Sequence, residues 1–278
     1  MFKKIALIPV LSLCCMVSAF EISTDFPGGN IEVLKKSNNG AKVAQQIRDT
    51  SEWWFYWNFE VSGAAGKTLE FKFANGDPIG SFGPAASYDG GKTWEWLGAG
   101  CVKRGKDTSS FKVSIPQNAQ SARFAFCIPY MPADFDALAK EIPSLKKHPL
   151  CKTRKGRENY YYTLGNPDGK LKIFLTSRHH ACESTGTYVM EGILRELAKN
   201  GSGESSLLKD AEVIAVPFMD LDGVVDGDQG KYRKPHDHNR DYSESPIYPS
   251  VAAFKSLYNK ASESAEKVVA LDLHSPWM

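Results

Sequence analysis

The 278-residue sequence has little net charge, few cysteines and no long apolar run after its first twenty residues. The formal charge is +2, and two of the basic residues, Lys3 and Lys4, lie in an N-terminal leader. Without an excess of positive charge, nothing points to nucleic acid or an anionic membrane as a partner. Without a second apolar run, no membrane span is expected after the leader. The content of 42% hydrophobic and 24% charged residues is typical of soluble globular proteins and excludes a fibrous or disordered chain.

Residues 1–19 have the pattern of a secretion signal peptide. Lys3 and Lys4 supply positive charge, Ile5–Val17 is almost entirely apolar, and the segment ends in small residues at Ala19. This apolar run is too short to span a bilayer comfortably. A buried N-terminal strand or helix is the alternative interpretation. We expect the mature chain to be exported, to the periplasm or beyond, and not to be bound to a membrane.

Four cysteines remain once the leader is removed: Cys101, Cys127, Cys151 and Cys182. Export permits disulfides, and four cysteines allow three pairings. A bond from Cys101 to Cys127 or Cys151 is compatible with the sequence. Four reduced thiols in a core or a loop are equally compatible.

Residues 20–158 are predicted to form an antiparallel β-sandwich. Apolar side chains alternate with a period of two in several segments, and no long helical pattern interrupts them. The alternating residues are Phe55, Trp57, Phe59 and Val61, then Leu69, Phe71 and Phe73, then Phe111, Val113 and Ile115, and finally Phe124, Phe126 and Ile128. The pair Asp89-Gly90 is typical of a hairpin turn. Aromatic residues on an exposed face could bind a glycan, but most are expected in the core.

Residues 159–278 are predicted to form an α/β domain with a mostly parallel sheet. Apolar strand patterns at 172–176, 213–216 and 268–273 alternate with helical patterns at 189–197 and 251–258. This order favours right-handed βαβ crossovers. In such sheets the ligand site lies beyond the carboxyl ends of the strands. Candidate functional residues are therefore those that follow Thr176, Phe218 and Leu273.

Metal-binding residue types occur after two of these strands. His180 and Glu183 follow the first strand, and His274 follows the last. Two histidines and a glutamate form the ligand set of a catalytic zinc site that leaves one position for water. The spacing His-x-x-Glu alone is weak evidence, but its placement at strand ends strengthens it. The alternative is that the histidines are satisfied by backbone groups.

The loop after the second strand carries further polar residues. His236 and His238 could bind a metal, but two histidines in a polar loop are more often solvated. The acidic run from Asp220 to Asp228 resembles a calcium-binding loop at first sight, but it lacks the glycine at the sixth position and the glutamate at the twelfth. Arg233, Asn239 and Arg240 are residue types that grip a carboxylate or stabilise an oxyanion.

These motifs together resemble the zinc metallocarboxypeptidases of the carboxypeptidase A family, closest to the branch related to cytosolic carboxypeptidases. The resemblance rests on four segments: Trp54–Phe59, Ile128–Met131, His180–Glu183 and Leu271–Ser275. The segment Gly230–Tyr242 is similar to the substrate-clamping segment of that family.

The resemblance implies one Zn²⁺ per chain, held by His180, Glu183 and His274, and a peptide or protein C-terminus as substrate. It also implies that Arg233 polarises the scissile carbonyl, while Asn239 and Arg240 hold the terminal carboxylate. The related branch usually has Pro-Gly where this chain has Ala181-Cys182, and Asn-Pro-Asp-Gly where it has Asp220–Gly223. Neither change removes a predicted ligand.

Two other functions stay open at this point: a zinc amidase or deacylase on a similar fold, and a non-catalytic protein that binds peptides or glycans. The resemblance also implies a glutamate general base far downstream of the last ligand. No acidic residue follows His274, and the part from Tyr160 onward is short for such a catalytic domain. We therefore expect a C-terminally truncated representative that is poorly stable and weakly active, because general acid–base help is worth about 10²–10⁴-fold.

Overall fold

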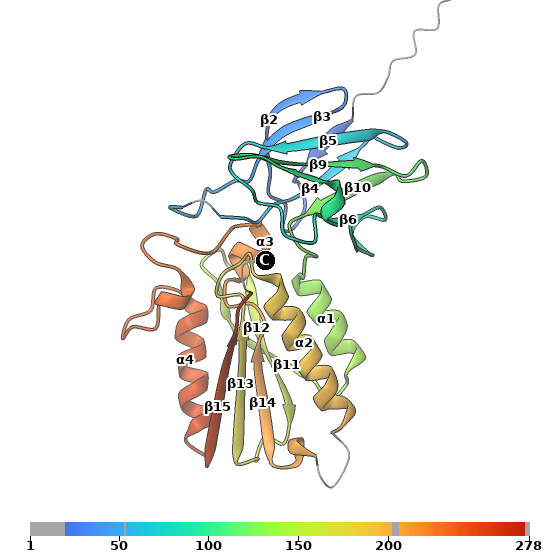
Figure 1. Cartoon of the computed structure of the whole chain (residues 1–278). Coiled ribbons are helices and arrows are strands. Elements are labelled where there is room, and N and C mark those ends of the chain that lie inside the picture. The colour runs from blue at the N-terminus through green and yellow to red at the C-terminus, as the bar shows by residue number, and fades with distance from the viewer. Residues whose placement is uncertain (1–19, 53, 202–205, 276–278) are drawn as a thin grey trace, which may run out of the picture.

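The computed structural model describes residues 20–52, 54–201 and 206–275. These residues form an N-terminal β-sandwich that lies on one end of a C-terminal α/β unit (Figure 1). The predicted fold class, a β-sandwich followed by an α/β carboxypeptidase-like unit, is confirmed. The predicted signal peptide lies outside the described residues.

The sandwich consists of two five-stranded sheets. The first has the order β1 (Glu21–Ser23), β4 (Asn58–Ser62), β10 (Ser121–Ala125), β6 (Ala85–Ser87) and β7 (Glu95–Trp96). The second has the order β2 (Glu32–Ser37), β3 (Gly40–Ala44), β5 (Thr68–Phe73), β9 (Ser109–Ser114) and β8 (Val102–Arg104). All pairings are antiparallel except that of β3 with β5. The antiparallel prediction therefore holds for all but one pair.

Alternating aromatic residues fill the space between the two sheets. Phe59 of β4 lies opposite Phe124 of β10, and Phe71 of β5 lies opposite Phe111 of β9. The rings of Phe59 and Phe71 meet across the sandwich, with centroids 5.0 Å apart. Trp57 is fully buried beside them. The period-two pattern therefore describes the core, as burial of aromatic area favours, and these aromatics offer no exposed face to a glycan.

The C-terminal unit is built on a five-stranded mixed sheet. Its order is β11 (Lys146–Lys152), β12 (Glu158–Gly165), β14 (Ala211–Val216), β13 (Leu171–Ser177) and β15 (Lys267–Leu273). The strands β13, β14 and β15, which the sequence predicts, are parallel to one another. Strands β11 and β12 add two antiparallel pairings. The sheet is thus parallel only in the part that the predicted crossovers build.

Helices cover both faces of this sheet. Helices α1 (Pro132–Glu141) and α2 (Ser184–Lys199) lie on one face, and α4 (Pro249–Ser262) lies on the other (Figure 1). The short helix α3 (Leu221–Asp226) lies beneath the sandwich. Short 3₁₀ segments span Ala99–Cys101, Leu207–Lys209 and His238–Arg240. None of the described helices is long and apolar enough to cross a membrane.

The predicted boundary after residue 158 is wrong. Helix α1 and strand β11 precede it, yet both belong to the C-terminal unit: β11 pairs with β12, and Phe135 of α1 packs in the core of that unit. The sandwich ends instead near Phe126, and the second unit begins near Met131. Cys101, Cys127, Cys151 and Cys182 are all free thiols, so the structure takes the reduced alternative.

Candidate metal and substrate site

The carboxyl ends of β13 and β15 bring the three predicted metal ligands together. The two strands are parallel neighbours with Ser177 opposite Leu273, so the turn after β13 and the residue after β15 leave the sheet side by side. His180 and Glu183 lie in that turn, which leads directly into α2, and His274 follows β15. Both segments end on the side of the sheet that faces the sandwich (Figure 1).

The ligand atoms of His180, Glu183 and His274 lie within 4.8 Å of one another. His180 Nδ1 is 3.0 Å from Glu183 Oε1, and His274 Nδ1 is 2.6 Å from Glu183 Oε2. His180 and Glu183 are buried, whereas the side chain of His274 is 34% exposed. Two imidazole nitrogens and a carboxylate that converge in this way fit a zinc ion with an open position.

Electrostatics around Glu183 favour the form that binds a cation. Burial alone would raise its pKa, but hydrogen bonds with His180 and His274 outweigh burial and lower the pKa of Glu183 to about 2. Hydrogen bonds to Asp272 and Glu183 raise the pKa of His274 to about 10. A metal ion bound here would therefore displace a proton from His274.

Asp272, the penultimate residue of β15, connects the predicted ligand His274 to the predicted substrate residue Asn239. Its carboxylate accepts hydrogen bonds from His274 Nε2 at 2.7 Å, His179 Nδ1 at 2.8 Å and the Asn239 amide at 3.1 Å. Thr176 Oγ1 donates a fourth at 2.9 Å. Such hydrogen bonds orient a ligating imidazole and fix its tautomer. Sequence analysis missed Asp272, although a lone carboxylate in an apolar strand was a usable signal.

His179 and Tyr242 extend this network. His179 is buried, and its Nε2 lies 2.7 Å from the Tyr242 hydroxyl. His179, Asp272 and His274 also form a compact donor group, but this group shares His274 with the set above. Because Asp272 already accepts four hydrogen bonds, we interpret it as the partner that orients His274.

The predicted substrate residues Asn239 and Arg240 lie on the 3₁₀ segment His238–Arg240. They line a cavity of about 450 Å³ together with His180, Asp237 and Ser51 of the sandwich. The amide of Asn239 is 3.2 Å from His274 Nε2, and Arg240 is exposed. The structure thus brings Asn239 and Arg240 to the side of the predicted ligands.

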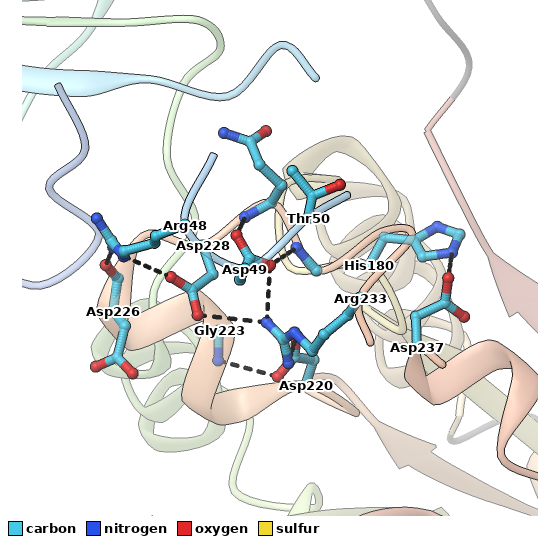
Figure 2. Close-up of polar contacts among 12 residues, drawn as sticks. Arg48, Asp49, Thr50, His180, Asp220, Gly223, Asp226, Asp228, Arg233 and Asp237 are labelled. Carbon is cyan, nitrogen blue, oxygen red and sulfur yellow. Dashed lines mark hydrogen bonds and ion pairs between the residues drawn. The ribbon is translucent and has the colours of Figure 1, made fainter. Parts of the chain in front are cut away.

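Arg233 lines the same cavity, but its guanidinium is bound by three carboxylates. Its Nη1 lies 3.0 Å from Asp220, and its Nη2 lies 3.1 Å from Asp49 and 3.3 Å from Asp228. Figure 2 shows the guanidinium pointing into these aspartates and away from His180. Burial opposes its charge, but Asp220 and Asp49 raise the pKa of Arg233. The acidic run rejected as a calcium loop thus supplies two partners of Arg233.

The other two loop histidines lie outside the group of predicted ligands. His236 Nε2 is 2.6 Å from Asp241. His238 is buried and stacks on Tyr248, with ring centroids 3.7 Å apart. Burial lowers the pKa of His238 to about 4, so this ring is neutral near pH 7.

Known proteins resemble both units. Residues 131–269, half of the chain, match the family described as zinc carboxypeptidase, and residues 22–126 match the cytosolic carboxypeptidase N-terminal domain. Cytosolic carboxypeptidase 6 of Caenorhabditis elegans is 30% identical over 176 residues, which cover 58% of this chain and 38% of that protein. Cytosolic carboxypeptidase 3 of Mus musculus is 28% identical over 175 residues, which cover 58% of this chain and 17% of that protein.

Among solved structures, a metallo-carboxypeptidase from Burkholderia cenocepacia superposes with a TM-score of 0.77 at 22% identity. The match covers 93% of this chain and 71% of that one, and at this identity it shows the fold. The chain spans well under half the length of these two curated relatives.

Proposed function

Because the chain belongs to the zinc carboxypeptidase family, we propose that it binds one zinc ion and acts as a zinc-dependent carboxypeptidase on the C-terminal residue of peptides or proteins. The observation that carries this proposal is the convergence of His180, Glu183 and His274 at the ends of β13 and β15. Bound there, zinc would lower the pKa of a water molecule and polarise the scissile carbonyl.

The residues of the chain would bind and orient the substrate. Arg240 is exposed and lines the cavity, and its guanidinium fork is suited to bidentate binding of a terminal carboxylate. Asn239 would contribute its amide from the same wall of the cavity. Asp272 accepts hydrogen bonds from both His274 and Asn239. One side chain therefore orients both the metal ligand and a residue that would bind the carboxylate.

The contacts of Arg233 favour an indirect role over direct polarisation of the carbonyl. Its guanidinium is committed to three aspartates, and a direct role would require it to leave them. We propose that Arg233 shapes the substrate loop, residues 227–240, and that zinc would provide most of the electrostatic stabilisation of the transition state.

A matched pair of peptides tests the proposed activity. The zinc-loaded protein is incubated with a peptide that has a free C-terminal carboxylate and with the same peptide ending in an amide. We expect binding and release of the last residue only from the free acid, because Arg240 recognises the carboxylate. Equal processing of both peptides would instead favour an amidase, and binding without product would favour a non-catalytic peptide-binding protein.

Export remains a separate proposal that rests on the pattern of residues 1–19. Expression of the full sequence in a bacterial host, followed by fractionation and N-terminal sequencing, tests it. We expect an exported chain that begins near Phe20. An intact N-terminus on protein retained in the cytoplasm would contradict it.

A further inference from the structure

Several sandwich residues contact the substrate loop, and one of them, Asp49, does so through a buried carboxylate. This residue follows β3 in the sandwich, and its side chain is only 9% exposed. Its Oδ1 accepts a hydrogen bond from the backbone N–H of Gln229 at 3.0 Å, and its Oδ2 accepts one from the backbone N–H of Gly230 at 2.7 Å. The same Oδ2 accepts from Arg233 at 3.1 Å. One side chain of the sandwich therefore holds the loop at three points (Figure 2).

The loop held by Asp49 packs directly on the turn that carries His180 and Glu183. The Gln229 carbonyl accepts from the Cys182 amide at 3.1 Å. Gly230 has φ +76°, and a Cβ added there would lie 2.2 Å from Ala181 N. This close approach leaves no space for a side chain. The loop backbone held by Asp49 thus packs against residues 181–182, which lie between the predicted zinc ligands His180 and Glu183.

The other end of the loop reaches the substrate cavity. The Tyr232 amide donates to Asp237 Oδ2 at 3.1 Å, and this oxygen lies 3.7 Å from His180 Nε2. Ser51, also of the sandwich, donates from its hydroxyl to the Tyr232 carbonyl at 3.0 Å. The loop conformation near Asn239 and Arg240 therefore depends on contacts made by the sandwich.

We propose that Asp49 is a positioning residue, through which the sandwich fixes the loop 227–240 in the conformation that binds substrate. The inference deepens the proposed carboxypeptidase function and rests on it for the substrate. Its structural part, that Asp49 fixes the conformation of the loop, stands independently of catalysis. A charged acceptor is required because both oxygens serve N–H donors, and an amide in its place would turn a donor toward one of them.

Trypsin provides a readout of the loop that needs no activity, because Lys231 and Arg233 are cleavage sites within it. We expect Asp49→Asn to accelerate cleavage after these two residues by about 10-fold or more, since loop opening follows the lost charge-assisted contacts. The matched control is Asp107→Asn, the same change at an exposed position of the sandwich. It should leave the cleavage rate unchanged.

Two further variants separate positioning from general destabilisation. Asp228→Asn weakens the contacts of Asp228 with Arg233 and Arg48 but leaves the Gln229 and Gly230 contacts in place. It should therefore accelerate loop cleavage less than Asp49→Asn. Asp49→Glu retains the charge but moves the oxygens, so it should fold and give an intermediate rate. It serves as the test if Asp49→Asn does not fold. Rates equal to wild type in every Asp49 variant that folds would overturn the proposal, as would acceleration spread evenly over sites outside the loop.

Binding measurements connect the loop to the substrate. Asp49→Asn should keep its zinc stoichiometry but bind the free-acid peptide about 10-fold more weakly, because the ligands remain while Asn239 and Arg240 lose their fixed position. Accelerated loop cleavage with unchanged peptide affinity would overturn the substrate part of the proposal. If wild type itself shows no affinity for the peptide, the proposed function fails, and the cleavage rates still decide the structural part.

Discussion

His274 is held between two carboxylates: its Nδ1 lies 2.6 Å from Glu183, and its Nε2 donates to Asp272 at 2.7 Å. The first contact points the ring into the predicted metal site, and the second fixes the ring from behind. Asp272 therefore orients the imidazole of His274, and an asparagine in place of Asp272 would do so only in part.

We predict that Asp272→Asn lowers zinc affinity by about 10–100-fold, because the neutral amide orients His274 less well and makes it a weaker ligand. Competition with a fluorescent zinc chelator measures the change. The control is Asp107→Asn, which should bind zinc as wild type does. Undiminished affinity in Asp272→Asn would show that the orientation of His274 does not depend on this carboxylate.

The buried neutral ring of His238 predicts a pH dependence of stability. Its pKa is about 4 in the folded protein and about 6.5 in the unfolded chain. Between these values the unfolded chain binds more protons, so the contribution is fully present above pH 6.5 and is lost as the pH falls toward 4. The difference corresponds to about 3 kcal/mol.

The variant His238→Phe tests this pH dependence while keeping an aromatic ring against Tyr248. Urea unfolding of both proteins at pH 7.5 and pH 4.5 gives four free energies. We expect the variant to lose about 2–3 kcal/mol less than wild type between the two pH values. Equal losses in the two proteins would mean that another group accounts for the acid sensitivity.

A buried ion pair of the α/β sheet should be costly to break from one side. Lys172 Nζ lies 2.9 Å from Glu212, and the two side chains are 3% and 15% exposed. We expect Lys172→Met to lower the free energy of unfolding by about 3 kcal/mol, because Glu212 is left without its partner. The double variant Lys172→Met/Glu212→Leu should recover most of the loss. Urea unfolding measures both, and a double variant no more stable than the single one would contradict this interpretation.

Replacement of Arg240 by lysine tests whether the substrate carboxylate is bound through two parallel hydrogen bonds or by positive charge alone. We predict that Arg240→Lys weakens binding of a free-acid peptide by about 10-fold, because one of two parallel hydrogen bonds is lost. Calorimetry with the amidated peptide is the control, and neither wild type nor the variant should bind it measurably. If the free acid binds as tightly to the variant, the carboxylate is held elsewhere.

The sequence predicts those parts of the fold and of the site that depend on the pattern of neighbouring residues. Period-two aromatics such as Phe59 and Phe71 predict the core of the sandwich, and ligand types after two strands predict the cluster of His180, Glu183 and His274. Strand β11 was missed because it has no apolar alternation and contains Pro149, features of a strand at a sheet edge. The domain boundary was misplaced because neither β11 nor the preceding helix α1 was predicted.

The partners of Arg233 could not be predicted from pattern. Asp49 lies 184 residues away in the chain and in a loop with no periodicity, so only the packing of the sandwich on the α/β unit brings the two together. The sequence, through the family resemblance, led us to expect Arg233 at the scissile carbonyl of the substrate. The structure shows that its charge is taken up by aspartates from both units.

Metal analysis of the purified chain tests the central claim most directly. Wild type and the double variant His180→Ala/His274→Ala are loaded with zinc, dialysed and measured by mass spectrometry, with circular dichroism to verify that both are folded. We predict one zinc per wild-type chain and none above background in the double variant, because only one of the three ligands remains. One zinc per chain in the double variant would contradict the site.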